Sequence, residues 1–128
     1  MTGGDLRYRG NLGTGIYRVF DLAVASSGIT QKEALKLGYE IEVIHNTKAS
    51  HAEYMGGQKM VIKAVADKKT RTLLGVQIIG YEGVDKRLDV LVTLMTYRVP
   101  VEDFFHLDLG YAPPFSTTKD PVHYTGMI

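Results

Sequence analysis

The sequence has no cysteine, and its charge is almost balanced. Without a cysteine the chain cannot form a disulfide framework, a thiolate metal site, a cysteine nucleophile or a thiol redox centre. Fifteen Lys and Arg residues face 14 Asp and Glu residues, which gives a formal net charge of +1. Such a balance produces no long-range field for nucleic acid or an anionic membrane. We therefore expect no nucleic-acid partner and no membrane partner.

Long hydrophobic runs are missing as well. No stretch reaches the roughly 20 apolar residues that a membrane helix needs, and the first nine residues lack the apolar segment of a targeting peptide. The hydrophobic fraction is nevertheless 45%, close to the globular average. A chain of 128 residues is long enough for one core and too short for a second full domain. These features predict one soluble, cytoplasmic domain.

The first 13 residues are rich in glycine and polar side chains, in Gly3-Gly4-Asp5 and again in Gly10-Asn11-Leu12-Gly13. We interpret residues 1–13 as a connector from a missing N-terminal portion and residues 14–128 as the domain itself. β-Branched and aromatic residues are then frequent from Ile16 to Val24. That composition predicts one largely buried strand.

The next elements are predicted by capping and by alternation. Thr30 and Glu33 form a capping-box pattern for a helix over residues 31–37, which Gly38 ends. Apolar residues alternate with glutamates over residues 39–44, the pattern of a half-buried strand.

The second half of the chain predicts a hairpin, two helices and an arm. Residues 59–66 and 72–80 flank a polar turn, as in a β-hairpin. Apolar residues at helical spacing predict the longest helix over residues 84–99. We expect a short helix over residues 101–107 and an extended arm over residues 108–128. This order favours an α+β fold, with a mostly antiparallel β-sheet and helices packed on one face.

Complete catalytic and metal-binding motifs are missing from the chain. The four histidines lack the helical spacing of a metal motif, and no serine stands in a Gly-x-Ser-x-Gly elbow. The N-terminal glycines precede a predicted strand, whereas those of a dinucleotide fingerprint follow one. We therefore expect no metal site, and we interpret the serines as caps and loop donors.

Two segments carry candidate functional residues. His51-Ala52-Glu53-Tyr54 leads into Met55-Gly56-Gly57, a loop whose glycines would allow a ligand to approach the backbone. The alternative is a turn with Tyr54 packed beneath it. In Tyr111-Ala112-Pro113-Pro114-Phe115-Ser116 the prolines stiffen a segment that loses little entropy on docking. A tyrosine hydroxyl there can hydrogen-bond, or transfer a proton if its surroundings lower a pKa normally near about 10.

Several short motifs between Leu12 and Met127 follow one family pattern. They are Thr14-Gly15-Ile16, Val19-Phe20-Asp21, Gly28-Ile29-Thr30, His51-Ala52-x-Tyr54, Leu74-Gly75-x-Gln77-Ile78-Ile79-Gly80, Gly83-Val84-Asp85-Lys86-Arg87, Tyr111-Ala112-Pro113-Pro114-Phe115-Ser116 and Lys119-Asp120-Pro121. In this order they resemble the C-terminal dimerisation domain of FAD-dependent pyridine nucleotide-disulfide oxidoreductases. The branch is that of coenzyme A-disulfide reductases, NADH oxidases, NADH peroxidases and persulfide reductases.

The resemblance implies a homodimer in which this domain closes the active site of the opposite subunit. FAD, NAD(P)H and the redox cysteine would belong to the N-terminal domains of the parent enzyme, so the isolated fragment is expected to bind no cofactor and to be inactive. Tyr111 would orient or protonate a leaving thiolate in the partner's site. Tyr54 would line the entrance for a coenzyme A-type thiol or disulfide. The other residues expected to line the site are His51, Ala112, Pro113, Pro114, Phe115 and Ser116.

Two other functions stay open at this point. One is a small self-sufficient enzyme that uses Tyr111 or Tyr54 with a histidine for acid-base chemistry, which would require a perturbed pair in one pocket. The other is a free-standing ligand-binding or scaffold module without catalysis of its own. A flavoprotein reading frame upstream of Met1 would favour the interface domain.

Overall fold

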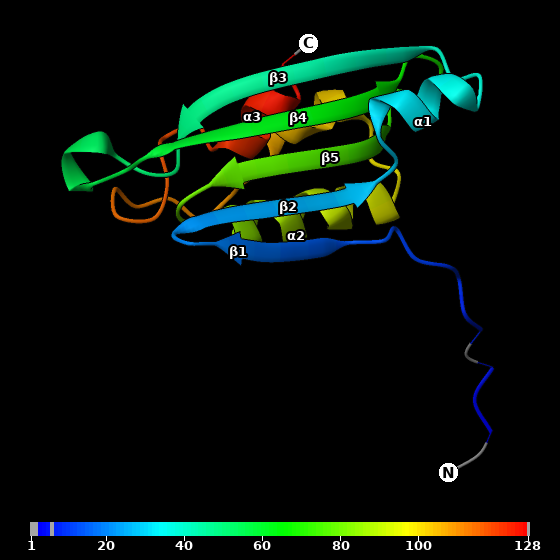
Figure 1. The fold of residues 1–128 in the computed structure, drawn as a ribbon, viewed down its shortest axis with the longest axis horizontal. Helices are drawn as coiled ribbons and strands as arrows, with labels where there is room; N and C mark the ends of the chain where they lie inside the picture. Colours follow the sequence, from blue (N-terminus) through cyan, green and yellow to red (C-terminus); the bar gives the residue numbers. More distant parts are fainter. Residues whose placement is uncertain (1–2, 6, 128) are drawn as a thin grey trace.

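The computed structural model describes residues 3–5 and 7–127, and its centre is one five-stranded sheet (Figure 1). The strands are β1 (Gly15–Val19), β2 (Leu22–Gly28), β3 (Ile41–Ala49), β4 (Lys59–Asp67) and β5 (Leu73–Gly80). They lie in the order β1-β2-β5-β4-β3, and each neighbouring pair is antiparallel. The predicted α+β fold with an antiparallel sheet is confirmed.

The helical segments are α1 (Gln31–Lys36), η1 (Glu53–Met55), α2 (Val84–Thr96), η2 (Val101–His106) and α3 (Pro121–Thr125), with η marking 3-10 helices. α2 packs on β2 and β5, α3 packs on β3 and β4, and both lie behind the sheet in Figure 1. The short α1 borders the opposite face, where Leu35 lines a shallow hollow together with Lys63 and Gln77. Among the residues described, no helix has the length and apolar character needed to cross a membrane.

The core lies between the sheet and α2. Met60 and Ile62 on β4 and Ile78 on β5 are fully buried, and Leu88 and Leu91 of α2 pack against them. The intervening strand residues point to the other face, because side chains alternate along a strand. Each fully buried side chain of this size stabilises the fold by about 1.5–3 kcal/mol relative to exposure. The core therefore fixes α2 on the sheet, with its N-terminal end beside the end of β5.

The predicted cap of α1 is present. The Thr30 hydroxyl accepts a hydrogen bond from the Glu33 amide at 3.2 Å, and the Glu33 carboxylate accepts one from the Thr30 amide at 2.7 Å. The helix ends at Lys36, and Gly38 follows with a φ of +84°. The strand predicted over residues 39–44 is present as β3, which begins at Ile41 and runs on to Ala49. The hairpin of β4 and β5 is confirmed, and the helix predicted over residues 84–99 is present as α2, which ends at Thr96. The short helix after Pro100 is confirmed as the 3-10 helix η2.

The prediction of one buried strand from Ile16 to Val24 is wrong. Phe20 and Asp21 form the turn of a hairpin, and Val19 pairs with Leu22 across it. Phe20 has a φ of +53°, a conformation that bulky residues rarely adopt. The Phe20-Asp21 sequence also lacks the Asn-Gly or Asp-Gly signal of a tight hairpin, so the turn could not be recognised from residue type. β1 is one of the two edge strands of the sheet, and it is exposed along its whole length.

The prediction of an extended arm to the C-terminus is also partly wrong, because α3 interrupts it. Asp120 caps this helix, since its carboxylate accepts a hydrogen bond from the Val122 amide at 3.0 Å. Pro121 occupies the first helical position, where its fixed φ suits a helix and its missing N–H costs nothing. Pro121, which lies within the predicted extended arm, is thus the first residue of a helix.

Candidate functional site

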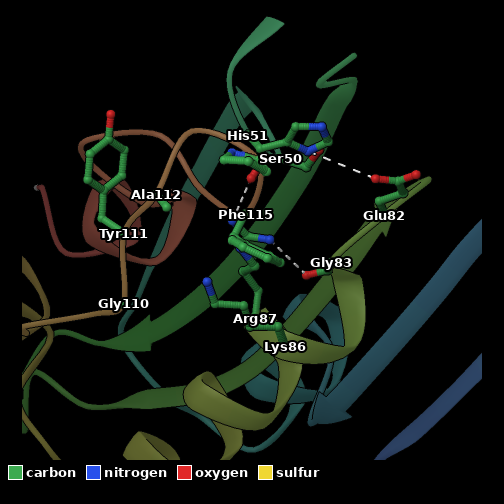
Figure 2. Close-up of a pocket in the computed structure, with 11 residues that line it drawn as sticks. Ser50, His51, Glu82, Gly83, Lys86, Arg87, Gly110, Tyr111, Ala112 and Phe115 are labelled. Carbon is green, nitrogen blue, oxygen red and sulfur yellow. Dashed lines mark hydrogen bonds and ion pairs between the residues drawn. The ribbon is translucent and has the colours of Figure 1, made fainter. Parts of the chain in front are cut away.

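A cavity of about 510 Å³ opens where three distant parts of the chain meet (Figure 2). They are the loop between β3 and β4 (residues 50–58), the N-terminal end of α2, and the arm between η2 and α3 (residues 107–120). The lining residues are Ser50 and His51 from the loop, Glu82, Gly83, Lys86 and Arg87 around the start of α2, and Gly110, Tyr111, Ala112, Pro114 and Phe115 from the arm. The structure thus brings the two segments singled out in the sequence to one place.

Some of the predicted site residues do not line this cavity. Tyr54 lies on the 50–58 loop outside it, and Pro113 and Ser116 are also outside its lining. The Pro113 carbonyl oxygen accepts a hydrogen bond from the Ala52 amide at 3.1 Å. The Ser116 hydroxyl donates to the Asp120 carboxylate at 2.8 Å and is fully buried. These two residues hold the arm in place, and Ser116 is too deeply buried to meet a ligand.

The two candidate tyrosines are both accessible. The side chain of Tyr111 is 54% exposed and that of Tyr54 is 79% exposed, so the alternative in which Tyr54 packs beneath the turn is wrong. In Figure 2 the Tyr111 hydroxyl points away from Lys86 and Arg87. Neither hydroxyl has a hydrogen-bond partner within residues 3–5 and 7–127. Both are therefore available to a ligand or to another chain.

His51 braces the loop. Its ring is 7% exposed, with Nε2 at 3.2 Å from the Met55 carbonyl oxygen and Nδ1 at 3.0 Å from the Ser50 hydroxyl. A carbonyl oxygen only accepts, so Nε2 carries the proton and Nδ1 can accept from the serine. Both ring nitrogens therefore have partners in the loop, and Nδ1 also lies 3.9 Å from the Glu82 carboxylate (Figure 2). Neither nitrogen is hydrogen-bonded to Tyr54 or Tyr111 among the described residues.

The glycines of the loop serve its own closure. A Cβ at Gly57 would overlap the carbonyl oxygen of His51, and Gly56 has a φ of +86°. Only glycine fits the close approach at residue 57 without a backbone shift. Gly57 is therefore required by the packing of the loop on itself, whereas a Cβ at Gly56 would meet open space and only its positive φ favours glycine.

A buried ion pair lies behind the cavity. Arg87 is 1% exposed and Asp120 is 2% exposed. The Arg87 Nη2 atom donates to the Asp120 carboxylate at 2.7 Å, and Nε lies at 3.1 and 3.2 Å from its two oxygens. Nη2 also donates to the Ser50 carbonyl oxygen at 2.6 Å. One guanidinium therefore joins α2, the loop and the start of α3.

The charge state of Asp120 depends on that guanidinium. Burial alone would raise the pKa of Asp120, but hydrogen bonds from Arg87, Val122 and Ser116, together with the charge of Arg87, outweigh it and hold the pKa below its usual value. A depressed folded-state pKa contributes stability above the unfolded value of about 3.9, and this contribution is lost as the pH falls through the folded value.

Arg87→Met is expected to change this pH dependence. Without the guanidinium the effect of burial remains, so the folded-state pKa of Asp120 rises. Protonation of Asp120 at low pH then no longer lowers the stability of the variant. The difference in unfolding free energy between wild type and variant should therefore shrink as the pH is lowered from 7 through about 4. Urea denaturation at a series of pH values measures it. In an Asp120→Asn background the effect of Arg87→Met should not vary with pH, and a constant difference in the Asp120 background would contradict the assignment.

Sequence reasoning missed the residues at the start of α2 and the Arg87–Asp120 pair. A signal was present, since the Gly83–Arg87 and Lys119–Pro121 motifs had both been noted. What the pattern did not show is that these motifs touch, because 33 positions separate the two charged residues. Throughout residues 3–5 and 7–127, no three His, Asp or Glu side chains gather in a group able to hold a metal ion.

The chain is similar to known proteins over nearly its whole length. Residues 16–121 match the family model described as pyridine nucleotide-disulphide oxidoreductase, dimerisation domain. A CoA-dependent NAD(P)H sulfur oxidoreductase of Pyrococcus furiosus is 37% identical over 95% of this chain and 28% of its own length. A coenzyme A disulfide reductase of Staphylococcus aureus is 32% identical over 98% of this chain and 29% of its own length.

A solved structure agrees with these sequence relatives. The crystal structure of reduced CoADR-RHD from Bacillus anthracis superposes with a TM-score of 0.92 at 40% identity, over 96% of this chain and 22% of that one. The chain thus spans less than a third of the length of each of these proteins. The family match over residues 16–121 includes the sheet and the three segments that form the cavity.

Proposed function

Because the chain belongs to the dimerisation-domain family of the pyridine nucleotide-disulphide oxidoreductases, we propose that it serves as the subunit-contact domain of a flavin-dependent NAD(P)H:disulfide oxidoreductase. The domain pairs with a second copy in a homodimer and presents the rim of its cavity to the active site of the partner subunit. The observation that carries this proposal is Tyr111, which is half-exposed on that rim.

The proposed substrate class is a coenzyme A-type thiol, disulfide or persulfide. The Pyrococcus furiosus relative is a CoA-dependent NAD(P)H sulfur oxidoreductase, and the Staphylococcus aureus relative is a coenzyme A disulfide reductase. In the cavity Lys86 supplies a cation whose side chain is 39% exposed and whose Nζ lies 3.9 Å from the Asp120 carboxylate. Arg87 is buried and binds the same carboxylate more closely, at 2.7 Å. A partly exposed ammonium suits the phosphate groups of such a substrate. Tyr54 lies at the entrance in this proposal, and its ring can contact the part of the substrate outside the cavity.

In this proposal the chain contributes one reactive group, the hydroxyl of Tyr111. A phenol with a pKa near about 10 can hydrogen-bond to a thiolate, whose conjugate acid has a pKa near about 8.5, and can return a proton to it. The Pro113-Pro114 pair stiffens the arm beside this residue. A hydroxyl held in this way orients the leaving sulfur and stabilises its negative charge.

FAD and NAD(P)H are proposed to bind outside this chain. Dinucleotides bind at the ends of parallel strands in a βαβ unit, with a glycine-rich turn opening the helix. The described residues form an antiparallel sheet without such a unit, which supports the assignment of both dinucleotides to the portion outside this chain. The redox cysteine is assigned to the same outside portion, because this chain has no cysteine. Flavin chemistry would supply the electrons there.

We also propose that residues 1–13 connect to that portion. Met1, Thr2 and Leu6 lie outside the described residues. Residues 3–5 and 7–11 are exposed, and the first contact with the sheet is a hydrogen bond from the Gly28 amide to the Leu12 carbonyl oxygen at 2.8 Å. This contact supports a boundary near residue 13.

A chimera tests the proposal. The part of the Pyrococcus furiosus relative that lies outside the matched region is joined to this chain, and the product is compared with the same part alone. We expect the chimera to sediment as a dimer with bound flavin and to reduce coenzyme A disulfide with NAD(P)H. The truncated protein should lack this activity, since the arm that completes the site is missing. A flavin-loaded dimeric chimera without any disulfide reductase activity would count against the proposed function.

A further inference from the structure

We propose that Arg87 is a positioning residue, which locks the loop carrying Tyr54 and the arm carrying Tyr111 into one fixed arrangement. The proposal rests on the proposed function for the roles of the two tyrosines, but its structural part stands on the contacts of Arg87 alone. Arg87 lies on α2, which the core holds rigidly against β2 and β5. The guanidinium is therefore a fixed point between two irregular segments.

On the loop side, the contact of Arg87 is with the backbone. Its Nη2 atom donates to the Ser50 carbonyl oxygen at 2.6 Å, directly before His51. His51 then braces the loop through the Met55 carbonyl oxygen at 3.2 Å, one residue beyond Tyr54. The buried guanidinium on α2 thus fixes the first residue of the loop. The His51 imidazole then connects this end of the loop to Met55, the residue after Tyr54.

On the arm side, the contact runs through Asp120. The Asp120 carboxylate accepts from Arg87 Nη2 at 2.7 Å and from the Ser116 hydroxyl at 2.8 Å. Ser116 lies directly after Phe115 at the end of the Tyr111–Ser116 segment, and it is 1% exposed. The carboxylate therefore fixes the C-terminal end of the segment that carries Tyr111.

One backbone hydrogen bond joins the 50–58 loop directly to the 107–120 arm. The Ala52 amide donates to the Pro113 carbonyl oxygen at 3.1 Å. Within the part of the chain that the structure describes, it is the only hydrogen bond joining the 50–58 loop directly to the 107–120 arm. The Ala52 amide is thus a single-atom probe of whether the two tyrosine-bearing segments are held together.

The chemistry of the pair fits positioning better than a role in the stability of the fold alone. Replacement of a buried ion pair by apolar residues of similar volume is often neutral or stabilising, so stability by itself does not require charges here. A guanidinium offers five donors in a planar fork, which lets one side chain meet a carboxylate and a carbonyl at the same time. Lysine has a compact ammonium and cannot reproduce that geometry.

Hydrogen exchange in the full 128-residue chain tests the inference. Arg87→Lys keeps the charge but loses the fork, so the Ala52 amide should lose on the order of tenfold protection or more relative to the Ile62 amide in the centre of β4. A role in global stability alone would lower both amides together and leave their ratio unchanged. Arg71→Lys is the matched control, because Arg71 also bridges two partners, Glu42 and Glu102, but in a more exposed position away from the cavity.

A second variant guards against unfolding. Ser116→Ala removes the hydroxyl that donates to Asp120 and to the neighbouring Thr117 carbonyl oxygen, and it should lower the same protection ratio with the core intact. An unchanged ratio in both variants overturns the proposal.

In the active chimera, Arg87→Lys should lower kcat about tenfold and leave KM for NAD(P)H unchanged, and an unchanged kcat would also overturn the positioning role. If the wild-type chimera is inactive, the proposed function fails, whereas the exchange ratio still decides whether Arg87 joins the two segments.

Discussion

Asp120→Ala is expected to cost the chain about 3–5 kcal/mol of unfolding free energy, the largest stability loss that we anticipate for a polar residue. The variant leaves the Arg87 guanidinium buried without a counter-charge, since this side chain is 1% exposed. It also removes the hydrogen bonds to Ser116 and to the Val122 amide that caps α3. Because domains of this size are stable by only about 5–15 kcal/mol, the loss is a large fraction of the total.

Urea denaturation at pH 7 measures this loss, and a double-mutant cycle assigns it to the ion pair. Arg87→Met combined with Asp120→Ala should cost clearly less than the sum of the two single variants, because the double variant leaves no unpaired charge. Glu102→Gln is the control in an exposed ion pair with Arg71, where we expect little change. Additive single effects would show that the two residues stabilise the fold independently of each other.

The parts of the fold that the sequence predicted are those determined locally. The start of α1 was predicted from the capping box of Thr30 and Glu33. α2 was predicted from apolar residues at helical spacing, which form its buried face. The turn at Phe20 was missed because nothing in the residue type favours its positive φ of 53°. There the pairing of β1 with β2 overrides the local preference, a tertiary effect that periodicity does not contain.

The exposed residues of the candidate site could be predicted from the sequence, whereas the buried ion pair that holds them in place could not. Tyr111 and Phe115 were recognised because prolines and aromatics mark a stiff, exposed segment. Arg87 looked like one more charge at the start of an amphipathic helix, yet it is among the most deeply buried side chains. A charge is buried in this way only where a distant partner compensates it, and Asp120 comes from another segment of the chain. Sequence spacing alone does not reveal such a pair.

The removal of one hydroxyl in the chimera should give the largest loss of activity. Tyr111→Phe is expected to lower kcat for coenzyme A disulfide about 100-fold, at the lower end of the range for a positioned acid or base, and to leave flavin content unchanged. The ring of Tyr111 stays, so the arm and the shape of the cavity are preserved. The KM for the disulfide should change little, because the hydroxyl acts on the sulfur that leaves during the reaction and not on the bound substrate as a whole.

Tyr97→Phe is the matched control for this experiment. Tyr97 is 77% exposed and caps the opposite end of α2, a helix of 13 residues. At a rise of about 1.5 Å per residue, it lies roughly 20 Å along the helix from the cavity. Its variant should therefore retain wild-type kcat. Equal activity of the Tyr111→Phe and Tyr97→Phe chimeras would remove the Tyr111 hydroxyl from the mechanism. A loss confined to Tyr111→Phe would place a proton donor of this domain at the reacting sulfur, because the two variants differ only in where the same oxygen is deleted.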